Sequence, residues 1–214
     1  DTRPFGWQAL VGRNASMNGG SEQVGHPLQR HDGVAMMSAC EAVLKGVLEQ
    51  KVAVSRFIMT ESRASRRLQE ALRLPEIRDL LRRHRLVDRV VDDAGRTLEM
   101  ARWDTREGRH VVAMGTGPTV TSAVRELERS GNRPFQNAEA VAVVLEDLGT
   151  RPGLRQRLAA AGLPILEATS VTHIRDSIEH ALRLSRAACV PTVMLVDREI
   201  LQSMASIQIL PNRV

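Results

Sequence analysis

Aromatic side chains are scarce in this 214-residue chain: they make up 2% of it, and there is no tyrosine. Proteins that hold single-stranded nucleic acid stack its bases on aromatic rings, so this shortage argues against such a platform. Lysine is rarer still, since Lys45 and Lys51 are the only lysines among 30 basic residues. The arginines are spread along the chain between Asp and Glu, which is typical of solvated helix faces. We therefore expect no nucleic-acid partner, despite a formal net charge of +5.

Long apolar runs and metal-binding patterns are missing as well. No run of about 18 apolar residues occurs, so we expect no membrane-spanning helix and no membrane partner. The two cysteines, Cys40 and Cys189, lie in apolar segments without metal-ligand spacing, which predicts buried, reduced thiols in a cytoplasmic protein. None of the six histidines pairs with another His or with a Cys at the spacing of a zinc site. The sequence therefore predicts no metal site built by this chain alone.

What the chain does have is enough apolar residues, 43%, to bury a sizeable core. Short apolar segments alternate with amphipathic ones, which predicts an α/β fold with a parallel sheet of about six strands and helices on both faces. We expect strands over 52–59, 86–91, 110–114, 138–145, 163–167 and 191–196. We expect helices over 35–50, 62–73, 75–85, 92–106, from Pro118 onward, and over 154–161 and 173–188.

The stretch from Gly108 to Arg125 is the clearest unit of this pattern. A short apolar run ends in Gly115-Thr116-Gly117, and Pro118 suits the first turn of a helix. Strand, glycine turn and helix form half of a βαβ unit, whose turn lies at the carboxyl edge of the sheet, where ligands bind. The turn lacks the lysine of a phosphate loop and the third glycine of a dinucleotide fingerprint. It predicts either a plain tight turn or an anion site at the following helix.

Acidic residues at the ends of expected strands are further candidates. Glu61 follows the first strand, Asp92 and Asp93 the second, and Glu146 and Asp147 the fourth. In a parallel sheet these positions share one edge. The same residues also suit helix caps or solvent-exposed positions, so both interpretations stay open.

The order of segments resembles a known family. Met37 to Glu49 (Met-Ser-Ala-Cys-Glu-Ala-Val-Leu-Lys-Gly-Val-Leu-Glu) is similar to the opening helix of the pyrimidine-binding domain of 2-oxoacid:ferredoxin oxidoreductases, particularly the indolepyruvate type. Val143-Val-Leu-Glu-Asp-Leu-Gly-Thr resembles the family's Val-Val-Ala-Asp-Asp-Pro-Gly turn. Further similar stretches start at Leu98, Gly108, Leu163 and Pro191, so the resemblance spans about residues 33–196.

The resemblance implies a thiamine diphosphate fold and an oxidoreductase acting on a 2-oxoacid such as pyruvate or indolepyruvate. Such domains bind the aminopyrimidine of thiamine diphosphate against a partner subunit or domain, which holds the diphosphate and magnesium. In this chain the positions facing the cofactor would be Thr60, Glu61, Gly115, Thr116, Gly117 and Asp147.

The same resemblance puts Ala94 at the position of the family's catalytic glutamate, and Trp103 where the family has a small residue. An alanine cannot exchange a proton, so the resemblance implies a degenerate subunit with a structural or regulatory role. Two alternatives stay open. One is an active half-subunit that uses Glu61 or Asp93 instead, and the other is an unrelated phosphate-binding α/β enzyme that uses the Gly115 turn.

The chain divides into three parts by composition. Residues 1–32 are rich in Gly, Asn, Gln and Ser and predict an extended arm, residues 33–198 the α/β domain, and residues 199–214 a C-terminal tail, linker or docking strand. Phe5, Trp7 and Leu10 on the arm and the apolar stretch Ile207–Leu210 in the tail are hard to bury in a self-contained domain. Because exposed apolar segments mark interfaces, we expect an oligomer or a complex.

Overall fold

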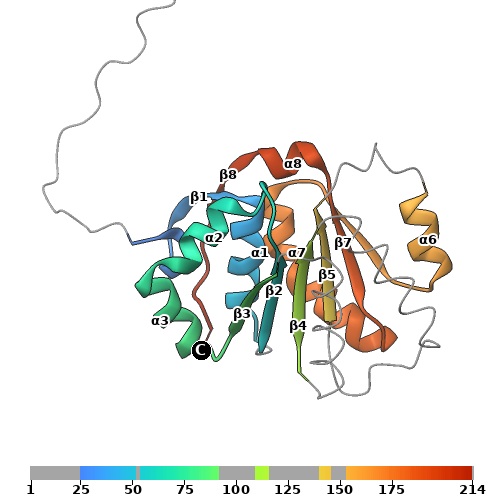
Figure 1. Ribbon diagram of the computed structural model, residues 1–214, viewed down its shortest axis with the longest axis horizontal. Helices are drawn as coiled ribbons and strands as arrows, with labels where there is room; N and C mark the ends of the chain where they lie inside the picture. Colours follow the sequence, from blue (N-terminus) through green and yellow to red (C-terminus); the bar gives the residue numbers. More distant parts are fainter. Residues whose placement is uncertain (1–24, 52–53, 92–108, 116–139, 146–152, 214) are drawn as a thin grey trace, which may run out of the picture.

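The centre of the computed structural model is a sheet of six parallel strands in the order β3-β2-β4-β5-β7-β6 (Figure 1). The structure describes residues 25–51, 54–91, 109–115, 140–145 and 153–213. The strands are β2 (Arg56–Thr60), β3 (Val87–Val91), β4 (Val111–Gly115), β5 (Ala140–Leu145), β6 (Ile165–Ala168) and β7 (Thr192–Val196). Each falls within or beside a segment expected from the apolar pattern, and the predicted α/β class is confirmed.

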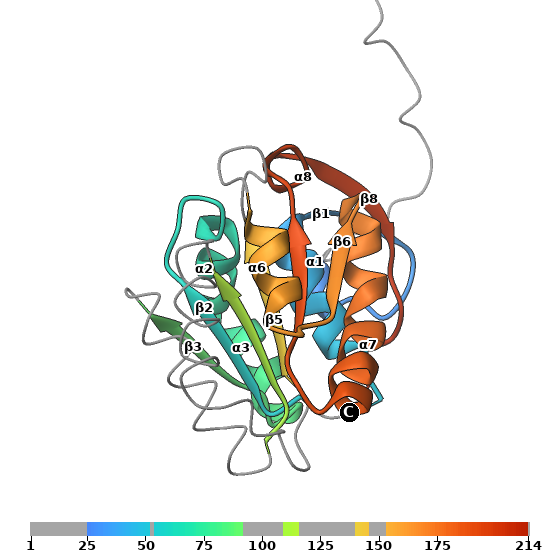
Figure 2. The ribbon, with the colours of Figure 1, turned by 90° about the vertical axis from the view of Figure 1, so that its right-hand side faces the viewer.

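Helices cover both faces of this sheet (Figure 2). One face packs against α1 (Ala39–Leu48), α7 (Val171–Ala188) and the hairpin of α2 (Arg66–Arg73) and α3 (Pro75–Arg83), and the other carries α6 (Leu154–Ala160). Alternate residues of each strand point to opposite faces. Phe57 and Met59 therefore join the core under α1, whereas Ile58 joins a cluster on the other face.

The helix expected over 35–50 begins later than the sequence indicated. Residues Val34–Ser38 form a strand, β1, and α1 starts only at Ala39. Ser38 is the N-cap: its hydroxyl accepts from the amide of Glu41, while the Glu41 carboxylate accepts from the Ser38 amide. This capping box, together with the in-out alternation of Val34 to Met37, separates strand from helix.

The helix α1 is enclosed on all sides, and each of its ten residues is buried. Gly46 lies at its crossing with α7. A Cβ atom at this position would lie 2.8 Å from the carbonyl oxygen of Arg175 and 2.8 Å from Cγ1 of Ile178. The close packing of α1 on α7 therefore requires a glycine, because any side chain would push the two helices apart.

The C-terminal segment returns across the molecule to meet the N-terminal one. After β7 the chain forms α8 (Arg198–Gln202) and β8 (Met204–Gln208), and β8 pairs with β1 in an antiparallel two-stranded ribbon. Ile207 and Ile209 are buried in the main core. The apolar stretch Ile207–Leu210, which we expected to mark an interface, is thus partly buried by the chain itself, and of its three apolar residues only Leu210 is exposed.

Several expected features lie outside the described residues, namely the helix over 92–106, the helix from Pro118 and the first 24 residues of the arm. The rest of the expected arm includes a short 3₁₀ helix, η1 (Pro27–Gln29), whose Leu28 is completely buried. Within the described part of the chain, no helix combines the length and the apolar character needed to cross a bilayer.

Candidate functional site

The structure brings three of the predicted site residues to one edge of the sheet. Thr60 is the last residue of β2 and Gly115 the last of β4, and these strands are parallel neighbours. Glu61 follows directly, and its amide donates to the carbonyl of Val91 at the end of β3 (2.8 Å). Thr60 is buried, whereas the Glu61 side chain is exposed. Adjacent carboxyl ends of parallel strands are the usual ligand-binding edge of such a sheet.

A compact serine turn holds the backbone after Glu61. Ser65 is fully buried, and its hydroxyl donates to the carbonyl oxygen of Thr60 or Ser62 and accepts from Nε2 of Gln69 (2.9 Å). The Ser62 amide donates to the Ser65 hydroxyl (3.1 Å), and the Ser65 amide to the Ser62 hydroxyl (3.2 Å). The loop between β2 and α2 is therefore fixed by its own hydrogen bonds, and it presents Glu61 to solvent at the carboxyl edge. The serines in Glu-Ser-Arg-Ala-Ser were the available sequence signal for this turn.

The other predicted site positions lie outside the described residues. They are Thr116, Gly117 and Asp147 of the two turns, together with Asp93, Ala94 and Trp103. The interpretation of the Gly115 turn as an anion site or as a plain turn therefore stays a prediction.

The described residues do not by themselves form a site for the magnesium that accompanies thiamine diphosphate. Among them, no three His, Cys, Asp or Glu side chains lie close enough together to hold a metal ion. Thr60 and Glu61 offer a hydroxyl and a carboxylate, which could contact polar atoms of a ring. They do not offer the several oxygen ligands that magnesium requires.

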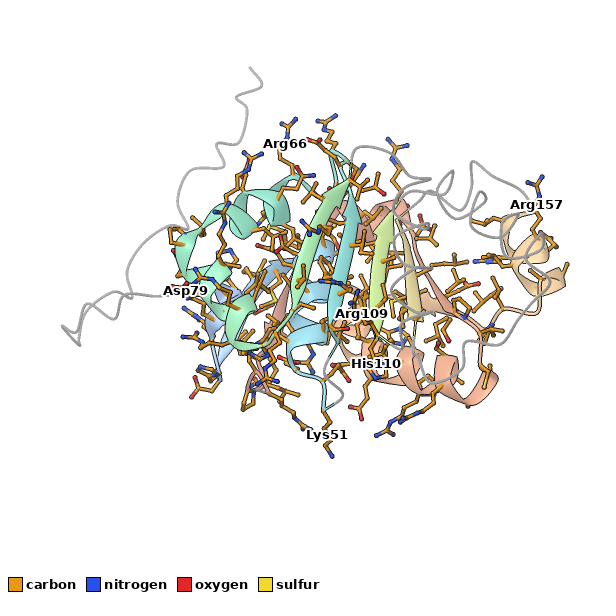
Figure 3. All side chains as sticks on the ribbon, turned by 60° about the horizontal axis from the view of Figure 1, so that its bottom comes forward. Lys51, Arg66, Asp79, Arg109, His110 and Arg157 are labelled. Carbon is orange, nitrogen blue, oxygen red and sulfur yellow. The ribbon has the colours of Figure 1, made fainter. Side chains whose placement is uncertain are left out.

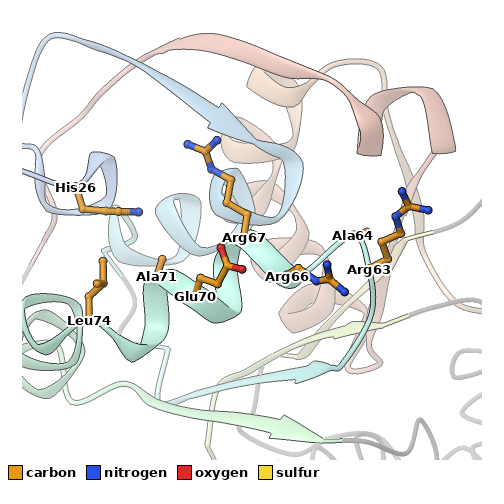
Figure 4. Close-up of a pocket in the computed structure, with 8 residues that line it drawn as sticks. All are labelled: His26, Arg63, Ala64, Arg66, Arg67, Glu70, Ala71 and Leu74. Carbon is orange, nitrogen blue, oxygen red and sulfur yellow. The ribbon is translucent and has the colours of Figure 1, made fainter.

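Basic side chains lie at both edges of the sheet (Figure 3). Figure 3 shows Arg66 at the edge where β2 and β4 end, and Lys51, Arg109 and His110 at the opposite edge. An open groove of about 560 Å³ lies between η1 and α2, lined by His26, Arg63, Ala64, Arg66, Arg67, Glu70, Ala71 and Leu74. In Figure 4 the Arg67 side chain points toward β1, while the guanidinium groups of Arg63 and Arg66 lie apart from it, near the beginning of α2. The guanidinium groups do not converge, so the groove is a basic surface and not a pocket for one anion.

Beneath this groove, Glu41 is a completely buried carboxylate. Its Oε2 accepts from the amide and from the hydroxyl of Ser38, both at 2.8 Å. Its Oε1 accepts from Nε of Arg67 at 3.0 Å and lies 3.7 Å from Nε2 of His26. Burial lowers the pKa of the His26 imidazole, and the charge of Arg67 lowers it further against the opposing effect of Glu41. Arg67 is therefore the cation that neutralises Glu41.

A second buried polar cluster lies at the other end of α1. The Lys45 ammonium donates to the carbonyl of Arg30 (2.8 Å) and to Oδ1 of Asn212 (2.5 Å), and it lies 3.5 Å from Oε1 of Glu49. Burial lowers the pKa of Lys45 to about 8, against the opposing attraction of Glu49. Burial also raises the pKa of Glu49, although Lys45 and Arg175 oppose this shift. These contacts connect α1 to the segment before β1, which contains Arg30, and to the segment after β8, which contains Asn212.

Sequence reasoning missed both clusters. Glu41, Lys45 and Glu49 are spaced four residues apart, which on a helix puts them on one side. The same spacing is common on solvated surfaces, so it does not by itself reveal burial.

The two cysteines differ, and the expectation that both are buried is wrong for Cys189. Cys40 is buried on α1, where its thiol donates to the carbonyl of Ala64, and burial raises the pKa of this thiol to about 12. Cys189 is exposed at the C-cap of α7, with a left-handed backbone (φ 53°). The apolar run around Cys189 belongs to a helix end, which faces solvent.

Comparison with known proteins gives a match at the level of structure only. No protein-family model matches the chain, and no curated protein matches it in sequence. Among solved structures, the chain is similar to 2-oxoglutarate:ferredoxin oxidoreductase from Magnetococcus marinus, determined with 2-oxoglutarate, coenzyme A and succinyl-CoA bound. The match has a TM-score of 0.59 and 17% sequence identity, over 86% of this chain and 32% of that one. The chain thus has a fold found in that enzyme and spans about a third of its length.

Proposed function

We propose that this chain is a subunit or domain of a thiamine diphosphate-dependent 2-oxoacid oxidoreductase complex, with a structural or regulatory role. The observation that carries the proposal is the six-stranded parallel sheet, which matches a 2-oxoacid:ferredoxin oxidoreductase over most of the chain. The sequence motifs point to the same family independently of this match.

The motif of the opening helix supports the proposal because the fold uses its polar and small residues. Glu41 closes the capping box, Gly46 permits the contact with α7, and Glu49 belongs to the buried cluster with Lys45. A stretch that resembles a family's motif, and whose residues also serve the packing of this fold, supports the proposal better than sequence similarity alone.

The proposed cofactor is thiamine diphosphate with magnesium, bound only in the presence of a partner that carries the diphosphate-binding domain. The cofactor, when bound, supplies the carbanion chemistry of 2-oxoacid decarboxylation. Thr60, Glu61 and Gly115 of this chain, with Thr116, Gly117 and Asp147, would form the wall that faces its ring. With Ala94 at the glutamate position, this wall would orient the ring without exchanging a proton.

Titration calorimetry tests the cofactor half of the proposal. The isolated chain, with magnesium present, should show no saturable binding of thiamine diphosphate, because the described residues lack a magnesium site. Co-purification from the native source, with mass spectrometry of subunits and cofactors, should then find the chain with a partner subunit and thiamine diphosphate. Tight binding to the chain alone, or a native chain without any such partner, would contradict the proposal.

A second candidate is an active half-subunit in which Glu61 replaces the missing glutamate. Its support is the position of Glu61, which is exposed at the carboxyl edge between β2 and α2. The test is the turnover of the reconstituted complex with Glu61→Gln. A loss of turnover with unchanged assembly would favour this candidate, while Glu70→Gln on the exposed side of α2 serves as the matched control.

A further inference from the structure

The outer face of the β1–β8 ribbon carries exposed apolar side chains. Val34 is 52% exposed, Met36 50% and Met204 41%. The register pairs Met36 with Ser206 and Ser38 with Met204, and residues opposite each other in an antiparallel pair share a face. The alternate residues Ala35, Met37 and Ile207 are buried against the core.

This face is the main concentration of exposed apolar side chains in the described part of the chain. Leu210 lies two residues after Gln208, the last residue of β8, and is 45% exposed. Because Ile209 between Gln208 and Leu210 is buried, the alternation of exposed and buried residues continues to Leu210. The other large apolar residues that are exposed, Leu74, Val87 and Val90, lie on α3's N-terminus and on β3. An apolar face of this kind normally contacts another segment.

An apolar segment of the same chain lies close by in sequence. The residues before Gly25 include Phe5, Trp7, Leu10 and Val11. Phe5 and Trp7 are two of only five phenylalanine and tryptophan residues in the whole chain. Aromatic rings form favourable contacts with methionine sulfur, and Met36 and Met204 supply two such atoms on the ribbon.

The length of the chain allows the contact. Gly25 precedes η1, which leads into β1, so Gly25 lies within about 35 Å of Val34 even if the backbone between them were fully extended. The backbone between Trp7 and Gly25 can span about 60 Å. The N-terminal segment can therefore reach any part of the ribbon in its own molecule.

We propose that residues 5–11 pack on the outer face of the β1–β8 ribbon of the same molecule, with Phe5 and Trp7 against Met36 and Met204. The N-terminal segment then covers the ribbon that joins the two ends of the described chain. This proposal does not depend on the proposed function.

Tryptophan fluorescence of the full chain tests the contact, since Trp7 and Trp103 are the only tryptophans. With Trp103→Phe as the parent, the emission of Trp7 should be blue-shifted from that of free indole and protected from acrylamide. Met36→Asp should shift this emission to the red and raise the quenching constant toward that of an exposed indole. The matched control is Val90→Asp, at an exposed apolar position on β3, which should change neither quantity. A parent protein with fully exposed Trp7, or a Met36→Asp emission equal to that of the parent, overturns the proposal.

A second measurement needs no change to the ribbon. Peroxide oxidation followed by mass spectrometry should show faster oxidation of Met36 and Met204 in the full-length variant Phe5→Asp/Trp7→Asp than in the parent chain. Met37, whose side chain is completely buried, is the internal control. Equal rates in both chains overturn the proposal. So does a Trp7 blue shift that disappears on dilution together with a dimer in sedimentation, because the segment would then contact a second copy.

Discussion

The two ends of α1 each bury a carboxylate, and they do so in different ways. Near the N-terminus, Glu41 accepts hydrogen bonds from Ser38 and from Arg67, whose side chain is half exposed. Near the C-terminus, Glu49 lies between Lys45, which is completely buried, and Arg175, whose side chain is 10% exposed. Glu41 therefore has a cation that can return to water, whereas Glu49 and Lys45 depend on each other. The second arrangement is the more sensitive to the loss of one partner.

Lys45→Met should give the largest effect. It removes the cation beside Glu49 and the donor to Asn212 and to the carbonyl of Arg30. Breaking a buried ion pair costs 3–5 kcal/mol in general, and we expect about 3 kcal/mol here, since Arg175 still faces Glu49. Denaturant unfolding measures this difference.

The matched control for this variant is Lys51→Met, because Lys51 is the chain's other lysine and is exposed. It should change the free energy of unfolding by less than about 0.5 kcal/mol. The double variant Lys45→Met/Glu49→Gln should recover part of the loss, because it removes the unpaired charge. Equal stability of Lys45→Met and the parent would contradict the described pairing.

The pH dependence of the free energy of unfolding should differ between the parent protein and Lys45→Met. Burial lowers the pKa of Lys45 from 10.5 to about 8, so between these values the unfolded chain holds a proton that the folded chain has lost. The free energy of unfolding of the parent should therefore rise with pH across this window relative to that of Lys45→Met. The rise is at most about 3.5 kcal/mol, since one pKa unit corresponds to about 1.4 kcal/mol.

The difference between the pH profiles of the parent and of Lys45→Met cancels the titration of the other groups, because both proteins contain them. Burial raises the pKa of Cys40 to about 12, which lowers stability as pH increases above 9, but this group is present in both proteins. The chain has no tyrosine that would titrate in the same range. Parallel pH profiles of the two proteins would show that Lys45 keeps an ordinary pKa.

Glu41→Gln should give the smallest effect. Glutamine keeps an acceptor for the Ser38 amide, and Arg67 can turn toward solvent once the charge is lost. We expect a loss of about 1–2 kcal/mol, as for a helix cap. Melting temperatures of Glu41→Gln and of the exposed control Glu70→Gln measure it. A loss as large as that of Lys45→Met would remove the contrast between the two ends of α1.

The sheet could be predicted because its strands are apolar on both faces. Val111–Gly115 and Thr192–Val196 are buried throughout, so each segment is marked in the sequence without knowledge of its neighbours. The position of Thr60, Glu61 and Gly115 at one edge followed from the assignment of these segments as parallel strands, since parallel strands end on the same side. Val34–Ser38 was missed because its strand partner, β8, lies far away in sequence.

The α/β class, the six strands and the edge at which a candidate site lies follow from the amino-acid sequence, because apolar periodicity is a local property of the chain. Packing between distant segments buries Glu41, Lys45 and Glu49, leaves Cys189 exposed and places Ile207 in the core of its own chain. Each of these depends on what the returning segments cover. Two charges four residues apart form the same sequence pattern on a solvated helix and on a helix enclosed by η1, α7 and the C-terminal segment. Only the surrounding chain distinguishes the two environments.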